Sequence, residues 1–161
     1  MALRAIGPVG QGLLDGRSSA EIVGFELHVR LRGLGSGSPQ AVEKIGIIDT
    51  GASHILVDRK TIKMLGLRGH NRGFAEIASG ESFPATIYRA IIEAPQLGVE
   101  LVTELYAFDE RGEYAQEVKP SPRVLVGRNF LRNFLVTFDG PSGIVTFARP
   151  VDYSSMPVDD E

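Results

Sequence analysis

The residues of this chain that could do chemistry lie at one position, where a single Asp follows an apolar run. Asp49 comes directly after Ile47 and Ile48, and the turn-forming residues Thr50 and Gly51 follow it at once. This pattern predicts a carboxylate presented at the end of a buried strand. Two such carboxylates a few ångströms apart can share one proton and polarise a water molecule between them.

The chain carries this motif once, so a pair of carboxylates would require two copies of the chain. No second Asp-Thr-Gly or Asp-Ser-Gly occurs in the 161 residues. A symmetric dimer can bring the same residue of both subunits to its two-fold axis. If the chain uses such a pair, the sequence therefore predicts a homodimer to which each chain contributes one Asp49.

Length and composition favour a single domain spanning residues 1–161, with a core at about 21–148 and a tail at 149–161. The 43% hydrophobic residues suffice for one core. A net charge of −3 without a basic stripe argues against nucleic-acid binding. No stretch of about 18 apolar residues predicts a membrane-spanning helix. The first twenty residues lack the apolar run of a signal peptide, so the cytoplasm is slightly favoured and the localisation stays open.

The side chains that usually hold metals are scarce and scattered. The chain has no Cys, and its three His are His28, His54 and His70. Without a cluster of such ligands we expect no metal site, and the proposed carboxylate chemistry needs no cofactor.

Nineteen Gly and nine Pro, spread between short apolar runs, predict a β-rich fold with many turns. Apolar and polar residues alternate from Phe25 to Arg32, which is typical of a strand with one buried face. Helices are expected at 59–65, capped by Asp58, and at 128–134. Further strands are expected at 42–48, 55–57, 74–78, 83–92, 97–108, 124–127, 135–138 and 144–147.

Three separated segments together resemble one protein family, the retropepsin-like aspartic proteases. Ile48 to Ser53 resembles their active-site loop, and a predicted hairpin with Ser79 and Gly80 at its tip lies where their flap would be. The segment 124–131 is similar to their apolar-apolar-Gly-Arg-Asn segment, and its Gly127 follows Asp49 by 78 residues. The matching order of segments covers about residues 21–147.

The resemblance implies a closed antiparallel acid-protease barrel, all-β apart from one or two short helices. It also implies an aspartic-type endopeptidase that acts as a homodimer on a peptide or protein in extended conformation. Asp49 would be catalytic, and Thr50, Gly51, Ala52 and Ser53 would support it, with Thr50 bonding across the dimer interface.

The resemblance also assigns roles to residues outside the Asp49 loop. The flap, at about Phe74 to Arg89 with Gly80 at its tip, would close over the substrate. Its flap and substrate residues would be Ile77, Ala78, Ser79 and Gly80. Val126, Gly127 and Arg128 would have structural roles behind the active-site loop. A hairpin turn without a flap's function would have the same turn chemistry as 77–80, so that assignment stays open.

The chain departs from the retroviral enzymes at Ser53, where those enzymes usually carry an acidic residue that pairs with the Arg of the Gly-Arg-Asn segment. We therefore expect Arg128 to find another partner. The Ser53 hydroxyl could instead donate to the outer oxygen of Asp49 and modulate its acidity. The terminal segments 2–6 and 144–147 could interleave between subunits, as in the viral enzymes.

Two alternatives remain beside a general endopeptidase. One is a non-catalytic dimeric module of the same fold that binds peptides or proteins. The other is a regulatory peptidase that cuts one partner or its own precursor. His54, next to the motif, could act as an acid or base, but a place in a substrate pocket or on the surface is favoured, because two carboxylates need no His.

Overall fold

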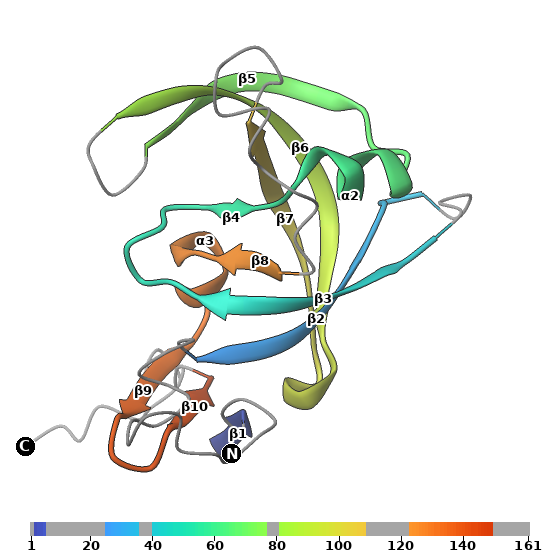
Figure 1. Cartoon of the computed structure of the whole chain (residues 1–161). Coiled ribbons are helices and arrows are strands. Elements are labelled where there is room, and N and C mark those ends of the chain that lie inside the picture. Colours follow the sequence, from blue (N-terminus) through green and yellow to red (C-terminus); the bar gives the residue numbers. More distant parts are fainter. Residues whose placement is uncertain (1, 6–24, 36–39, 77–80, 109–122, 150–161) are drawn as a thin grey trace, which may run out of the picture.

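A computed structural model describes residues 2–5, 25–35, 40–76, 81–108 and 123–149 (Figure 1). The predicted flap tip at 77–80 and the predicted surface loop at 109–122 lie outside these residues, as does nearly all of the predicted tail. In the described part of the chain, no helix is long and apolar enough to cross a membrane.

Six strands form a closed ring, which confirms the expected mostly β barrel. Each strand pairs with the next, and the last pairs back to the first through Arg30 to Arg32. In ring order the strands are β2 (Glu26–Arg32), β3 (Val42–Ile48), β8 (Arg123–Val126), β4 (Ile55–Leu56), β7 (Val99–Phe108) and β6 (Ser82–Ala94).

The barrel is mixed, and in this detail it differs from the antiparallel barrel that we expected. β3 pairs with β8 in parallel, and so does β4 with β7, whereas the other neighbours in the ring are antiparallel. The alternation of apolar and polar residues tells which face of a strand is buried, but it carries no information about the direction of the neighbouring strand.

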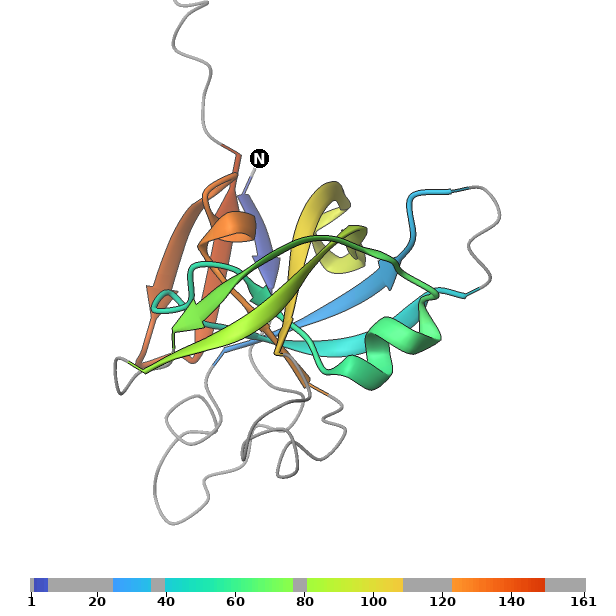
Figure 2. The same ribbon diagram turned by 90° about the horizontal axis from the view of Figure 1, so that it is seen from above.

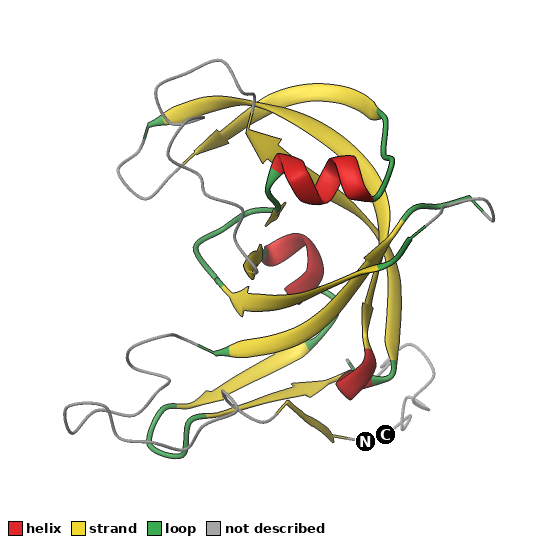
Figure 3. Cartoon of the chain, turned by 45° about the vertical axis from the view of Figure 1, so that its right-hand side comes forward, coloured by secondary structure: helices red, strands yellow, loops and turns green. Residues whose placement is uncertain are grey.

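A long hairpin arches over one side of the ring (Figure 3). Its strands are β5 (Gly69–Glu76) and β6, which pair in antiparallel register up to Glu76 opposite Ser82. The sequence predicted the hairpin, but it placed the start of the first strand at Phe74. The earlier residues are Gly-rich and polar, and they join the sheet because β6 extends far enough to pair with them.

A second, three-stranded sheet stands beside the barrel (Figure 2). It has the order β1 (Ala2–Ala5), β10 (Ile144–Ala148), β9 (Leu135–Asp139), and both pairings are antiparallel. The first described strand thus pairs with the last strand of its own chain. β10 is central in this sheet and has a neighbour on each side.

Within the described residues, two short α-helices and a 3-10 turn accompany the two sheets. α2 (Arg59–Met64) begins where the sequence predicted, because the Asp58 Oδ1 accepts a hydrogen bond from the Thr61 N–H at 2.9 Å. It ends before Gly66, whose φ of 62° suits a helix terminus. α3 (Arg128–Leu131) is shorter than the expected 128–134, and η1 (Pro95–Leu97) precedes β7.

The main core fills the barrel and continues under the three-stranded sheet. On β2 the side chains of Leu27, Val29 and Leu31 are fully buried, while His28 and Arg30 are exposed, as their alternation predicted. Phe130 of α3 and Phe147 of β10 belong to the same core and are also fully buried. This core holds β3, β8 and α3 in fixed positions, and these are the elements that place the Asp49 loop.

Candidate active site

Asp49 follows the last residue of β3, and the backbone fixes its position on both sides. Its own N–H donates to the Val126 carbonyl of β8 at 3.1 Å. The preceding N–H, of Ile48, donates to the Phe25 carbonyl at 2.9 Å. Ile48 is the last residue of β3 and its side chain is buried in the core, so the turn begins after it. Asp49 therefore lies at the start of the loop and is half-buried.

The Asp49 carboxylate is oriented by the turn that follows it. Its Oδ1 accepts hydrogen bonds from the Gly51 N–H at 2.8 Å and from the Ala52 N–H at 3.3 Å. Such bonds close a local turn and fix one carboxylate oxygen. The other oxygen, Oδ2, has no hydrogen-bond partner among the described residues. One oxygen is thus held by the backbone, and the other remains available for a water molecule or a second carboxylate.

Arg128 clamps the loop from outside. One of its guanidinium nitrogens, Nη1, donates to the Thr50 carbonyl at 2.9 Å and to the Gly51 carbonyl at 3.0 Å. The other, Nη2, donates to the Ser53 Oγ at 2.7 Å. A guanidinium can hold three acceptors at once because its donors form a planar fork. Arg128 has therefore found the alternative partners that the sequence required, and one of them is Ser53 itself.

The contact from Arg128 changes the expected role of Ser53. We expected the Ser53 hydroxyl to donate to Asp49, but in the structure its oxygen accepts from Arg128. Among the described residues, no hydrogen bond joins the Ser53 hydroxyl to Asp49. Thr50 and Gly51 are exposed at the tip of the same loop.

The start of α3 packs directly against the loop. The Arg128 N–H donates to the Ala52 carbonyl at 2.8 Å, and the Asn129 N–H donates to the Ser53 carbonyl at 3.1 Å. A Cβ on Gly127 would lie 2.7 Å from the Ala52 carbonyl oxygen and would also collide with the His54 carbonyl. Only Gly fits here, which explains why Gly precedes Arg and Asn in this segment.

The structure thus brings together most of the residues that the sequence singled out. The assembled residues are Asp49, Thr50, Gly51, Ala52, Ser53, Val126, Gly127 and Arg128. The predicted flap residues Ile77 to Gly80 lie outside the described residues, although β5 and β6, which lead to them, are in place. Among the described residues, no group of three His, Asp or Glu side chains is arranged to hold a metal ion.

The stacking of His54 on Tyr106 is a feature of the site that the sequence did not predict. The two rings are 4.0 Å apart at their centroids and 21° from parallel. Burial lowers the pKa of His54, and Arg128 and Arg132 lower it further, against the opposing effect of Glu104. Burial also raises the pKa of the Tyr106 hydroxyl. The contact depends on the parallel register of β4 and β7, for which the sequence carries no signal.

Comparison with known proteins gives similarity of structure only. No protein-family model matches the sequence, and no curated protein matches it. Among solved structures, a retropepsin-like aspartic protease from Rickettsia conorii is similar with a TM-score of 0.49 and 13% identity, over 91% of this chain and 88% of that one.

Two further solved structures are similar in the same way. The Simian Foamy Virus (mac) protease has a TM-score of 0.42 and 12% identity, over 66% of this chain and 91% of its own. The retroviral protease-like domain of Ddi1 from Leishmania major has a TM-score of 0.39 and 13% identity, over 79% of this chain and 97% of its own. The chain is therefore structurally similar to retropepsin-like aspartic proteases at low sequence identity. This similarity concerns the backbone and not the chemistry at Asp49.

Proposed function

We propose that this chain is an aspartic endopeptidase that works as a homodimer, with one Asp49 from each subunit. The observation that carries the proposal is the arrangement of the Asp49 carboxylate. Backbone N–H groups hold its Oδ1, its Oδ2 has no partner among the described residues, and Arg128 braces the loop. This arrangement suits a carboxylate that must meet a second, identical one.

In the proposed reaction the two carboxylates share one proton, and a water molecule lies between them. The ionised Asp49 takes a proton from this water molecule, and the water oxygen attacks the scissile carbonyl carbon. The protonated Asp49 of the other subunit donates its proton to the carbonyl oxygen. Collapse of the resulting tetrahedral species breaks the C–N bond. The leaving nitrogen takes the proton that the first Asp49 had removed from water, and one hydroxyl of the tetrahedral species returns a proton to the other Asp49. No covalent intermediate forms.

The substrate in this proposal is a polypeptide in extended conformation. Such a chain can form hydrogen bonds with strand backbones, so that side-chain pockets choose the sequence. The hairpin of β5 and β6 would cover the peptide, and residues 77–80 would form the tip of this cover. Two alternatives are a dimeric binding module without activity and a peptidase with one dedicated target. The following test distinguishes a general endopeptidase from these alternatives.

The test is cleavage of a diverse peptide mixture between about pH 4 and 7, the range in which a carboxylate pair is expected to work. Products are identified by mass spectrometry for the wild type and for Asp49→Asn. Asp139→Asn, at the last residue of β9, is a control with the same chemical change. We expect cleavage to disappear only in Asp49→Asn, with dimer and fold retained.

Mixed dimers test whether both carboxylates are needed. When wild-type and Asp49→Asn chains are mixed, the activity should fall with the square of the wild-type fraction, since a dimer with one Asn has lost one half of the pair. A linear decrease would show that one Asp49 suffices, and the proposed dyad would be wrong. A folded wild-type dimer that cleaves nothing would favour the binding module or the dedicated peptidase.

A further inference from the structure

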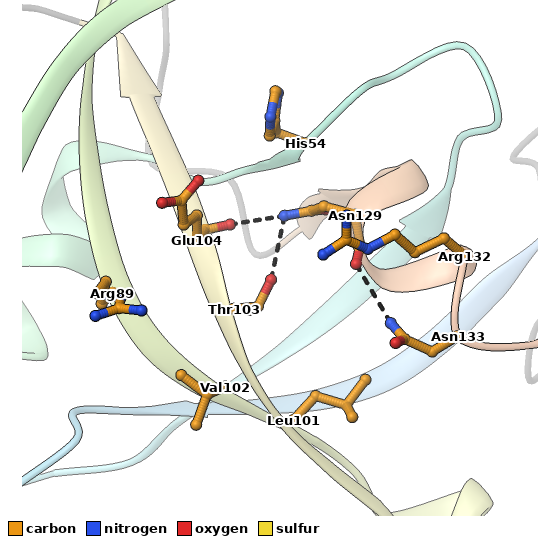
Figure 4. Close-up of a pocket in the computed structure, with 9 residues that line it drawn as sticks. All are labelled: His54, Arg89, Leu101, Val102, Thr103, Glu104, Asn129, Arg132 and Asn133. Atoms are coloured by element: carbon orange, nitrogen blue, oxygen red, sulfur yellow. Dashed lines mark hydrogen bonds between the residues drawn. The ribbon is translucent and has the colours of Figure 1, made fainter.

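A hollow of about 380 Å³ lies between β7 and α3, next to the Asp49 loop (Figure 4). His54, three residues beyond Gly51 of the Asp49 loop, lines one part of the hollow, and Asn133, two residues beyond the end of α3, lines another. Leu101 and Val102 contribute apolar surface, and Val102 is 61% exposed. The proposed cleavage chemistry does not use these residues.

The edge of β7 that faces this hollow offers free backbone groups. The Glu104 carbonyl accepts a hydrogen bond from the Asn129 side chain, and the Tyr106 carbonyl accepts one from the Val57 N–H, so both carbonyls point away from β6. In an antiparallel pair every second residue directs its N–H and C=O to the same side. Val102 therefore presents both groups toward the hollow, where no described residue bonds them.

Two cationic side chains flank the same hollow. Arg89 projects from β6, and Arg132 follows α3. Both are exposed, and neither forms an ion pair with a described residue. The acidic group among the lining residues is Glu104, whose carboxylate lies 3.4 Å from the His70 Nε2. The lining of the hollow thus contains two guanidinium groups and one carboxylate, and this carboxylate also lies close to His70.

We propose that this hollow binds an extended, acidic segment of polypeptide. The segment would add to the free edge of β7 at Val102, and its carboxylates would lie between Arg89 and Arg132. Strand addition supplies main-chain hydrogen bonds, and the flanking charges select the sequence. Binding itself does not require catalysis. The role of the hollow as an exosite for substrate, next to the loop that carries Asp49, rests on the proposed function.

The experiment measures peptide binding by fluorescence anisotropy at pH 7 in low salt, on Asp49→Asn protein so that nothing is cut. The probes are two labelled ten-residue peptides rich in Val and Thr, one with three Glu and the other with three Gln at the same positions. We expect the Glu peptide to bind about three- to tenfold more tightly, as for one or two exposed ion pairs. High salt should remove the difference.

Matched variants locate the site of binding. Arg89→Gln and Arg132→Gln should each weaken binding of the Glu peptide, whereas Arg68→Gln, an equal change of charge on an exposed residue outside the hollow, should not. In ¹⁵N-edited NMR spectra the Val102 amide should shift on addition of the Glu peptide. This shift distinguishes binding at β7 from binding beside Asp49.

Three results would overturn the exosite: equal affinity for the two peptides, an equal effect of Arg68→Gln and Arg132→Gln, or an unmoved Val102 amide at saturation. None of these results depends on cleavage. The peptide site can therefore fail while the wild-type protein cleaves peptides, and it can stand as a binding site, although not as an exosite for substrate, even if Asp49 proves inactive.

Discussion

Gly127 shows how closely single atoms constrain the candidate active site. A methyl group at this position would lie 2.7 Å from the Ala52 carbonyl oxygen and would also meet the His54 carbonyl. Both obstacles are backbone atoms of the Asp49 loop, which cannot rotate away as a flexible side chain could. Gly127→Ala should therefore displace the loop and destabilise the fold by about 1–3 kcal/mol.

The measurement for Gly127→Ala is urea unfolding together with peptide cleavage. Gly140→Ala is the matched control, because a Cβ at Gly140 has no atom within 4 Å. We expect cleavage to fall more than the loss of folded protein accounts for, since the Asp49 carboxylate moves with the loop. If Gly127→Ala and Gly140→Ala have the same stability in urea and the same cleavage activity, the prediction that α3 packs too closely on the loop to admit a Cβ is wrong.

His54 should titrate below the ordinary His value of 6.5. Burial against Tyr106 is the main cause, and Arg128 and Arg132 add to it. Because the pKa of His54 is lowered in the folded protein, the folded state prefers the neutral ring. Stability is then fully present above about pH 6.5 and decreases as the pH falls through the folded-state pKa.

NMR titration of the His54 ring tests this prediction. Arg132→Gln should raise the pKa of His54 toward 6.5 without reaching it, because burial remains. Arg68→Gln should leave it unchanged. His54→Gln should remove the corresponding part of the pH dependence of urea unfolding. A His54 pKa at or above 6.5 in the wild type would contradict the burial of this ring.

The start of α2 depends on one buried carboxylate. Asp58 accepts hydrogen bonds from the Thr61 N–H and from the Thr61 hydroxyl, and it pairs with Lys44 of β3 at 3.3 Å. Its side chain is 6% exposed and that of Lys44 is 11% exposed. Burial alone would raise the pKa of Asp58, but the bonds from Thr61 and the charge of Lys44 together lower it.

Asp58→Ala should therefore lower the free energy of unfolding by about 1–3 kcal/mol at neutral pH, since the helix loses its cap and Lys44 loses its ion pair with Asp58. Asp58→Asn keeps the cap and should cost less. Because the pKa of Asp58 is lowered in the folded protein, its stabilisation is present above about pH 3.8, the ordinary pKa of Asp. It is lost as the pH falls through the folded-state pKa of Asp58. The difference between wild type and Asp58→Ala in urea unfolding should shrink correspondingly in acid.

The sequence predicted those elements whose cause is local. β2 and β3 were recognised because one face of each enters the core, and α2 because Asp58 and Gly66 mark its ends. The parallel pairings and the early start of β5 were not predicted, because they depend on which distant strand lies alongside. The same distinction applies to the site. The Asp49 loop follows from its motif, whereas the stacking of His54 depends on register.

For the whole molecule, the proposed chemistry requires two Asp49 loops to meet, and β9 is the edge at which we expect the second copy to join. Within the described residues β9 pairs only with β10, and its Leu135 is 65% exposed. At the other end of β9, Phe138 packs on Phe25 at 5.1 Å between ring centroids, and the Phe25 carbonyl binds the Ile48 N–H. The free edge thus ends beside the base of the Asp49 loop.

Leu135→Lys tests this edge, because a Lys on an exposed edge strand opposes pairing with another chain. We expect the dissociation constant of the dimer to rise at least about tenfold, as for a loss of about 1.4 kcal/mol, in sedimentation experiments. Leu34→Lys, at a residue 48% exposed outside this sheet, is the control. Cleavage should decrease in parallel with the dimer and should return at high protein concentration, because each dimer carries the whole pair of carboxylates. A Leu135→Lys protein that dimerises like the wild type would place the interface elsewhere.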